Sequence, residues 1–194
     1  MAIADSGWLS SWASADVTVL DTDLDKLRMV FWRWQNRIKQ LASSTLAVQQ
    51  QVLEADMVIG AVLVPGARAP RIVTNDMVAA MKPGSVLVDI AVDQGGCFED
   101  THATTHADPT YRVHGSTFYC VANMPGSVPN SSTWALTNAT LPYAVRLANQ
   151  GWQQALRDDP ALAEGLNTHA GEIVYAPVAQ AHGLEHRELA EVLA

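Results

Sequence analysis

The sequence predicts an α/β fold built on a doubly wound parallel sheet, and three observations carry this prediction. Short apolar runs alternate along the chain with segments that repeat apolar residues at helical spacing. The apolar runs are nearly continuous, which is typical of strands buried on both faces of a parallel sheet. Most of them stop at an acidic residue or a Pro-Gly pair, which marks a strand end. We therefore expect a parallel sheet with helices on both faces.

The first half of the chain supplies three strands and two helices. The expected strands share β-branched and apolar residues and span residues 17–21, 38–41 and 57–63. The expected helices mix apolar and polar residues and span residues 23–35 and 45–55. Ser43 or Ser44 can cap the second helix, because a serine hydroxyl accepts a hydrogen bond from an N–H group of the first turn.

The second half begins with the same alternation. A short helix capped by Asn75 is expected over residues 75–81, and it stops at a Pro-Gly pair. Strands are expected over residues 85–91 and 118–122. The stretch between them, residues 97–117, is polar and irregular, and we assign it no element.

The character of the chain changes near residue 129, where the alternation of strands and helices stops. A long amphipathic helix is expected over residues 131–150, with a serine at its start and a glycine at its end. Pro142 interrupts or kinks this helix, because proline lacks the N–H that an interior position donates. Shorter helices and turns follow, so a domain transition is predicted near residue 129.

Composition excludes several classes of protein. The 194 residues are 48% hydrophobic and 16% charged, which excludes a disordered chain. The net charge of −8 argues against a nucleic-acid partner, because neutralising phosphates requires a basic face. No apolar run reaches the roughly 18–20 residues that cross a bilayer, and Asp5 stands where a secretory signal carries a basic residue. We therefore expect a cytoplasmic protein whose two cysteines, Cys97 and Cys120, are reduced and serve packing.

Asp21 is the first candidate functional residue, because it ends the buried strand VTVLD. In doubly wound dinucleotide folds, an acid at the end of the second strand binds the ribose hydroxyls of NAD, and its charge repels the extra phosphate of NADP. That role normally accompanies a G-x-G-x-x-G turn about 20 residues earlier. Here that distance leads back to residue 1, and the segment contains only Gly7. The alternative is that Asp21 caps the next helix.

Asp93 is the second candidate, because it follows the apolar strand of MKPGSVLVDIAVD at its carboxyl end, where ligands of open α/β sheets bind. Gly95 and Gly96 come next and permit close approach of the backbone. The alternative for Asp93 is a turn-forming role, since Asp-Gln-Gly-Gly is good turn chemistry. Asp89 lies inside the apolar run, and we interpret it as a buried, hydrogen-bonded structural acid.

The histidines and tryptophans receive structural interpretations. His102 and His106 are four residues apart in a loop without a helical face, and no Cys or Glu completes a metal-ligand set at usual spacing. We therefore predict no metal site. Trp32 and Trp34 are interpreted as core or interface residues.

Five segments resemble bacterial alanine dehydrogenase and, more loosely, the NAD-binding part of nicotinamide nucleotide transhydrogenase. In chain order they are VTVLDTDLDKLR, EADMVIGAVLVPGARAPRIV, MKPGSVLVDIAVDQGGCFE, FYCVANMPGSVP and TWALTNATLPY. The resemblance runs from about residue 15 to the end of the chain. It implies a Rossmann-like fold and the oxidative deamination of L-alanine to pyruvate and ammonia with NAD, together with the reverse amination. It also implies a cytoplasmic homo-oligomer, which is a hexamer in the family.

The resemblance assigns roles to eight positions. It makes Asp21 the ribose-binding acid, with Lys26 close by at the rim of the cofactor. It places Val62 and Leu63 in the loop that packs against the adenosine side.

The remaining assigned positions follow two later strands. The resemblance places Ile90 and Asp93 beside the nicotinamide and makes Asp93 a catalytic residue that steadies the reacting amine or the attacking water. Asn123 and Met124 fall on cofactor and active-site positions.

The sequence also departs from the resemblance. Nothing matches the family's N-terminal portion, which supplies the substrate-carboxylate arginine, a lysine and the acid/base histidine, and residues 1–14 match nothing. We therefore expect the C-terminal half of such an enzyme, from a truncated or frameshifted reading frame or a separated fragment. Residues 15–128 are expected to form a partial NAD-binding domain that lacks its first strand and glycine fingerprint. Residues 129–194 are expected to be a helical share of the substrate domain.

This expectation has consequences for activity, and it leaves alternatives open. An incomplete dinucleotide domain should have negligible alanine dehydrogenase turnover and weak NAD affinity. One alternative is a non-catalytic NAD-binding or oligomer-interacting module. Another is a transhydrogenase-type domain.

Overall fold

The computed structural model describes residues 15–35, 37–64 and 69–194. The predictions that concern Gly7, and part of the Pro- and Gly-rich loop after residue 63, lie outside these residues. The chain divides into two compact units, which are described separately. Unit 1 comprises residues 1–63 and 69–124, and unit 2 comprises residues 64–68 and 125–194.

Unit 1 alternates strands and helices, as predicted. Its first elements are β1 (Thr18–Asp21), α1 (Leu24–Trp34), β2 (Lys39–Ala42), α2 (Thr45–Glu54) and β3 (Met57–Gly60). Its later elements are α3 (Asn75–Ala79), β4 (Val86–Asp89), the 3-10 turn η2 (Val92–Gln94), β5 (Thr110–Val113) and β6 (Ser116–Tyr119). A second 3-10 turn, η3 (Met124–Ser127), follows at the boundary between the units.

The helices of unit 1 begin at side-chain caps. Asp23 caps α1, and Ser44 caps α2 by accepting a hydrogen bond from the third residue beyond it. The prediction of Asn75 as a cap was wrong, because Thr74 occupies that position and its hydroxyl accepts from the N–H of Met77. Asn75 is the first helical residue.

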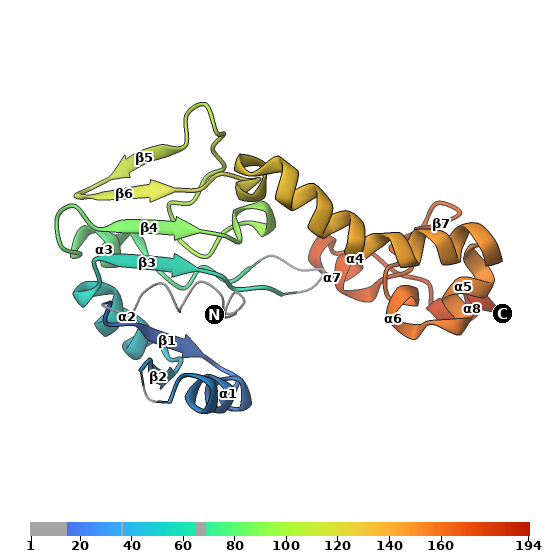
Figure 1. The fold of residues 1–194 in the computed structure, drawn as a ribbon, viewed down its shortest axis with the longest axis horizontal. Helices are drawn as coiled ribbons and strands as arrows, with labels where there is room; N and C mark the ends of the chain where they lie inside the picture. The colour runs from blue at the N-terminus through green and yellow to red at the C-terminus, as the bar shows by residue number, and fades with distance from the viewer. Residues whose placement is uncertain (1–14, 36, 65–68) are drawn as a thin grey trace. The chain divides into compact units, whose positions relative to one another are not determined.

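The strands form two sheets (Figure 1). β1 pairs in parallel with β2, and a four-stranded sheet has the order β3-β4-β6-β5. The β3–β4 and β4–β6 pairs are parallel, as the sequence predicted. β5 is antiparallel to β6 and was not predicted, because only two of its four residues, Tyr111 and Val113, face the core.

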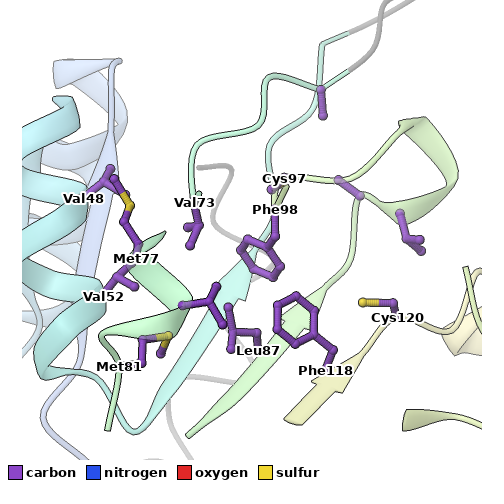
Figure 2. Packing of buried hydrophobic residues seen from close by; sticks show 14 of the residues in the cluster. Val48, Val52, Val73, Met77, Met81, Leu87, Cys97, Phe98, Phe118 and Cys120 are labelled. Atoms are coloured by element: carbon purple, nitrogen blue, oxygen red, sulfur yellow. The ribbon is translucent and has the colours of Figure 1, made fainter. Parts of the chain in front are cut away.

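One face of the four-stranded sheet carries the core. Leu87 of β4 and Phe118 of β6 are fully buried there, together with Phe98 from the loop after η2. The rings of Phe98 and Phe118 meet edge to face with their centroids 5.9 Å apart (Figure 2). Val52 of α2 and Met77 of α3 close this cluster from the helix side.

The opposite face of this sheet is only partly covered by the described residues, and its most exposed strand is β3. Met57 and Ile59 of β3 are 44% and 36% exposed, and Val88 beside Ile59 on β4 is half-buried. Because side chains alternate along a strand, these three residues share one face. Two apolar side chains of β3 are therefore exposed on this face among the described residues.

In the smaller sheet, β1 is covered on both faces, whereas β2 is mostly exposed. Val19 of β1 packs against Leu27 and Val30 of α1. Leu20, the next residue, joins the larger cluster that contains Val48 of α2. Successive residues of β1 therefore enter two different cores, as in a doubly wound arrangement.

Unit 2 is mostly helical, as expected. Its elements are α4 (Pro129–Gln150), α5 (Trp152–Asp158), α6 (Pro160–Ala163), β7 (Thr168–His169), β8 (Glu172–Ile173), α7 (Ala176–His182) and α8 (Leu189–Leu193). α4 begins at Pro129 without a serine cap and continues through Pro142, so the predicted cap and the predicted interruption were both wrong. Gly151 ends it, as predicted.

Unit 2 leaves much of α4 exposed. The guanidinium of Arg146 in α4 pairs with the carboxylate of Asp159, which caps α6. The hydrogen bond from the N–H of Leu162 is the main cause of the lowered pKa of Asp159. None of the residues of α4 is buried, and Trp134 is 65% exposed.

The core of unit 1 makes a testable prediction. Phe118→Ala should lower the free energy of unfolding by about 3–5 kcal/mol, because the cavity would open among fully buried side chains. Tyr119→Ala, on the half-exposed face of the same strand, is the matched control and should lower it by less than half as much. Urea unfolding followed by circular dichroism measures both, and equal effects would contradict this account of the two faces.

Candidate functional site

The parallel strands of unit 1 bring several predicted residues to one edge of the four-stranded sheet. Gly60 at the end of β3 lies opposite Asp89 at the end of β4, and Val88 lies opposite Tyr119 at the end of β6. The three chain segments that leave these strands therefore start at the same edge. They carry the predicted residues Val62, Leu63, Ile90, Asp93, Asn123 and Met124.

Hydrogen bonds tie these segments to one another. The N–H of Ile90 donates to the carbonyl of Gly60 at 2.8 Å, which extends the pairing of β3 and β4 beyond the strands. The N–H of Val62 contacts the sulfur of Cys97 at 3.4 Å. These bonds hold the chain after β3 against the chain after β4.

Asp89 anchors the loop that carries Asp93. Its carboxylate is fully buried and accepts hydrogen bonds from the N–H of Ala91 at 3.0 Å and the N–H of Cys97 at 2.8 Å. The hydroxyl of Thr101 donates a third bond at 2.5 Å. Three donors compensate the cost of burying a carboxylate, so the interpretation of Asp89 as a structural acid is confirmed.

The hydrogen-bonded loop around Asp89 requires a glycine at position 96. Its φ is +79°, and a Cβ there would come within 2.8 Å of the Asp89 carboxylate. The missing side chain of Gly96 therefore makes room for Asp89 and for Thr101, whereas the sequence suggested room for a ligand. Gly95 also has a positive φ and ends the η2 turn.

Asp93 lies in η2 and is exposed, directly beside the anchored loop. The segments that leave the same edge also carry two exposed apolar side chains, Leu63 at 58% and Ile90 at 45%. A sheet edge with an exposed carboxylate and exposed apolar groups suits a ligand with a flat ring and a polar reacting group. The side-chain oxygen of Gln94, next to Asp93, is buried and makes no hydrogen bond.

Asp21 ends β1 and is 4% exposed. Its carboxylate accepts a hydrogen bond from the N–H of Asp23 at 2.9 Å, and Asp23 itself caps α1. The alternative role of Asp21 as the helix cap is therefore wrong. Lys26 is exposed, and its ammonium lies 3.7 Å from the Asp23 carboxylate.

Asn123 is exposed and contacts His106, a residue that the sequence did not predict at this edge. A ring nitrogen of His106 lies 2.6 Å from the carbonyl oxygen of Asn123. No sequence pattern indicates this pair, because the two residues are 17 positions apart in irregular segments. Thr101 was missed for the same reason, since only the fold brings its hydroxyl to Asp89.

The cysteines and histidines support no nucleophile or metal site. Cys97 and Cys120 are fully buried, and burial raises the pKa of Cys97 to about 11, so its thiol stays neutral. This confirms their interpretation as packing residues. The ring of His102 stacks on Tyr111 with centroids 3.7 Å apart. In the part of the chain that the structure describes, no three His, Cys, Asp or Glu side chains are placed to hold a metal ion.

Two further features of the described residues bear on the location of a site. Every helix among them is too short or too polar to cross a membrane. Unit 2 contains an apolar hollow of about 200 Å³ that is lined by leucines, a tryptophan and a glycine. Because that hollow offers no charged or catalytic side chain, the edge of the sheet in unit 1 is the better candidate.

The anchoring role of Asp89 leads to a testable prediction. Asp89→Asn should lower the free energy of unfolding by about 1–3 kcal/mol, because the amide offers one acceptor oxygen and turns its N–H₂ toward a buried donor. Asp93→Asn, four residues away and exposed, should change it by less than about 0.5 kcal/mol. Urea titration of both variants provides the comparison, and an unchanged Asp89→Asn protein would rule out the anchor.

Comparison with known proteins gives a family and close relatives. The family model described as "Alanine dehydrogenase/PNT, C-terminal domain" matches residues 8–176, and this range begins inside the segment expected to match nothing. The alanine dehydrogenase of Halomonas elongata is 56% identical over 179 residues, which are 92% of this chain and 48% of the relative. The alanine dehydrogenase of Mycolicibacterium smegmatis is 55% identical over 180 residues, again 48% of its length. The chain thus spans about half the length of the curated relatives it matches.

Solved structures agree with the family and confirm the resemblance. An L-alanine dehydrogenase structure superposes with a TM-score of 0.76 and 44% identity, covering 96% of this chain and 49% of that one. A transhydrogenase from Sinorhizobium meliloti gives a TM-score of 0.54 and 31% identity over 62% of this chain. The greater coverage favours the first comparison over the second. The chain therefore belongs to the alanine dehydrogenase/PNT C-terminal domain family.

Proposed function

We propose that unit 1 binds NAD and supplies the cofactor side of an alanine dehydrogenase site. The observation that carries this proposal is the convergence of the segments after β3, β4 and β6 at one sheet edge. That edge is where open α/β sheets bind ligands, and here it carries Asp93 beside exposed Leu63 and Ile90. The identity of 56% to an alanine dehydrogenase supports the same reaction class.

The described residues fit part of a bound NAD. The carboxylate of Asp21 at the end of β1 suits the ribose hydroxyls, and the apolar Val62, Leu63 and Ile90 suit the faces of the rings. Among these residues, the pyrophosphate has no glycine-rich turn to bind. The side chains of Asp23, Ser44 and Thr74 already cap α1, α2 and α3. We therefore propose weak NAD affinity for the chain as it stands.

In this site the protein's own residues position and polarise the reacting groups. NAD, when bound, supplies the acceptor for the hydride that leaves the α-carbon of alanine. The Asp93 carboxylate accepts a hydrogen bond from the reacting amine or from the attacking water and so orients it. Asp89 fixes the loop of Asp93 through its three hydrogen bonds, and Ile90 and Leu63 exclude water from the ring edge.

The substrates are proposed from the family relationship. L-Alanine and pyruvate are the proposed substrates, and assembly into a homo-oligomer is proposed for the complete enzyme. We assign no residue of this chain to hold the substrate carboxylate. Residues 129–194 are proposed as part of the substrate domain. The reduced and buried thiols of Cys97 and Cys120 are compatible with a cytoplasmic location.

The proposal predicts binding without significant turnover. Calorimetric titration of the purified 194-residue chain with NADH should give weak one-to-one binding. An assay with L-alanine and NAD should show negligible formation of NADH, because acid/base and substrate-binding groups must also be in reach. Absence of any NADH binding would overturn the proposed function, and strong alanine-dependent NADH formation would overturn the predicted inactivity.

The ribose assignment makes a separate prediction about cofactor choice. NADH should bind about tenfold more tightly than NADPH, because the Asp21 carboxylate repels the extra phosphate. Asp21→Asn should reduce this preference to about twofold or less by removing the charge while keeping the shape. Asp56→Asn, a highly exposed acid of unit 1, is the control and should leave the preference unchanged. Equal preference in the unmodified chain would exclude Asp21 from the ribose site.

A further inference from the structure

A short segment outside the named strands pairs with the chain after β6. The N–H of Thr104 donates to the carbonyl of Cys120 at 2.9 Å, and the N–H of Ala122 donates to the carbonyl of Thr104 at 3.3 Å. Thr104 also forms an isolated parallel bridge with Val121. Residues 104–106, which we call the latch segment, therefore continue the hydrogen bonding of the sheet beyond the end of β6.

The residues just before the latch segment are held by the core of unit 1. The hydroxyl of Thr101 donates to the buried carboxylate of Asp89, and the N–H of His102 donates to the hydroxyl of Tyr111 at 3.1 Å. Tyr111 in turn packs against the main hydrophobic cluster. The latch segment therefore has a fixed position relative to Asp89, which also fixes the loop of Asp93.

Burial fixes the chain after β6 only over its first two residues. Cys120 and Val121 are 0% and 2% exposed, whereas Ala122 and Asn123 are exposed. In the exposed part, Nε2 of His106 lies 2.6 Å from the carbonyl oxygen of Asn123. Because a carbonyl oxygen can only accept, Nε2 must carry the proton that it donates. The side chain of His106 therefore holds a part of this segment that packing does not hold.

A hydrogen bond to this carbonyl orients a whole peptide group. The peptide bond between Asn123 and Met124 is trans, so its carbonyl and its N–H lie in one plane and point in opposite directions. The direction of the Asn123 carbonyl therefore sets the direction of the Met124 N–H and restricts where both side chains leave the backbone. The family resemblance assigns these same two residues to the cofactor and the active site.

We propose that His106 is a positioning residue of the cofactor site, which holds the peptide between Asn123 and Met124 in the orientation that receives NAD. The inference rests on the proposed function, because it requires NAD to bind at this edge of the sheet. His106 acts through the carbonyl of Asn123 and need not touch the cofactor. Without this hydrogen bond the exposed loop has several orientations, and NAD binds more weakly because it must order the loop.

Titration of variants of the full 194-residue chain with NADH provides the test. His106→Phe keeps a flat ring and removes the donor, so the dissociation constant should rise about fivefold, as for the loss of one hydrogen bond. His106→Gln places an amide N–H near the former Nε2, so the constant should return to within about twofold of the unmodified value. His182→Phe replaces an exposed histidine of α7 in unit 2. It is the matched control and should change the constant by less than about twofold.

The outcomes of this titration separate the inference from the proposed function. Absence of NADH binding by the unmodified chain would overturn the proposed function, and the inference would fall with it. NADH binding that is unchanged in His106→Phe would overturn the inference alone. Weaker binding that His106→Gln does not restore would also overturn it, because the hydrogen bond would then not be the cause.

NMR of the chain without nucleotide tests the hydrogen bond itself. In the unmodified chain, the nitrogen chemical shifts of the neutral imidazole should identify a proton on Nε2 of His106, and a proton on Nδ1 alone would contradict the bond. In His106→Phe, the order parameters of the Asn123 and Met124 amides should fall toward the flexible range below about 0.6. The amide of Leu87, inside the paired β4, should keep its value. A loop that stays equally rigid in His106→Phe would overturn the inference.

Discussion

The buried carboxylate of Asp89 is the interaction on which the candidate site depends. It stands at the end of the central strand β4 and accepts hydrogen bonds from Ala91, Cys97 and Thr101. These bonds turn the chain back on itself, fix the loop that holds Asp93 and require a glycine at position 96. A charged acceptor in a fully buried position holds its donors more firmly than neutral groups can, so the loop is defined before any ligand binds.

The two faces of the four-stranded sheet of unit 1 differ in how fully they are buried. Leu87 and Phe118 enter a core that α2 and α3 close, whereas Met57 and Ile59 lie exposed on the opposite face. The stability of unit 1 therefore comes mainly from one face of its sheet. The function proposed for unit 1 needs the carboxyl edge of this sheet, which the packed face holds in place.

Much of the fold was accessible from the sequence because local rules decide it. The apolar runs predicted β1, β3 and β4, and the serine pattern predicted the cap of α2. The errors have physical reasons. Thr74 displaced Asn75 as a cap because either side chain can accept the bond, and only the position at which the helix starts distinguishes them. β5 was missed because its alternation of Tyr111 and Val113 with polar residues lasts only four residues, too short to stand out in a polar segment.

The sequence by itself determined most of the succession of strands and helices along unit 1 and the acids Asp21, Asp89 and Asp93 at or just after strand ends, because hydrophobic runs and their terminating residues are local properties. Only the tertiary structure decided that Asp23 caps α1, that Thr101 reaches Asp89 and that His106 reaches Asn123. The cap is a local contact, and only the position at which the helix starts decided it. The other two contacts join residues 12 and 17 positions apart, and spacing along a sequence carries no information on pairings that arise when separate segments pack.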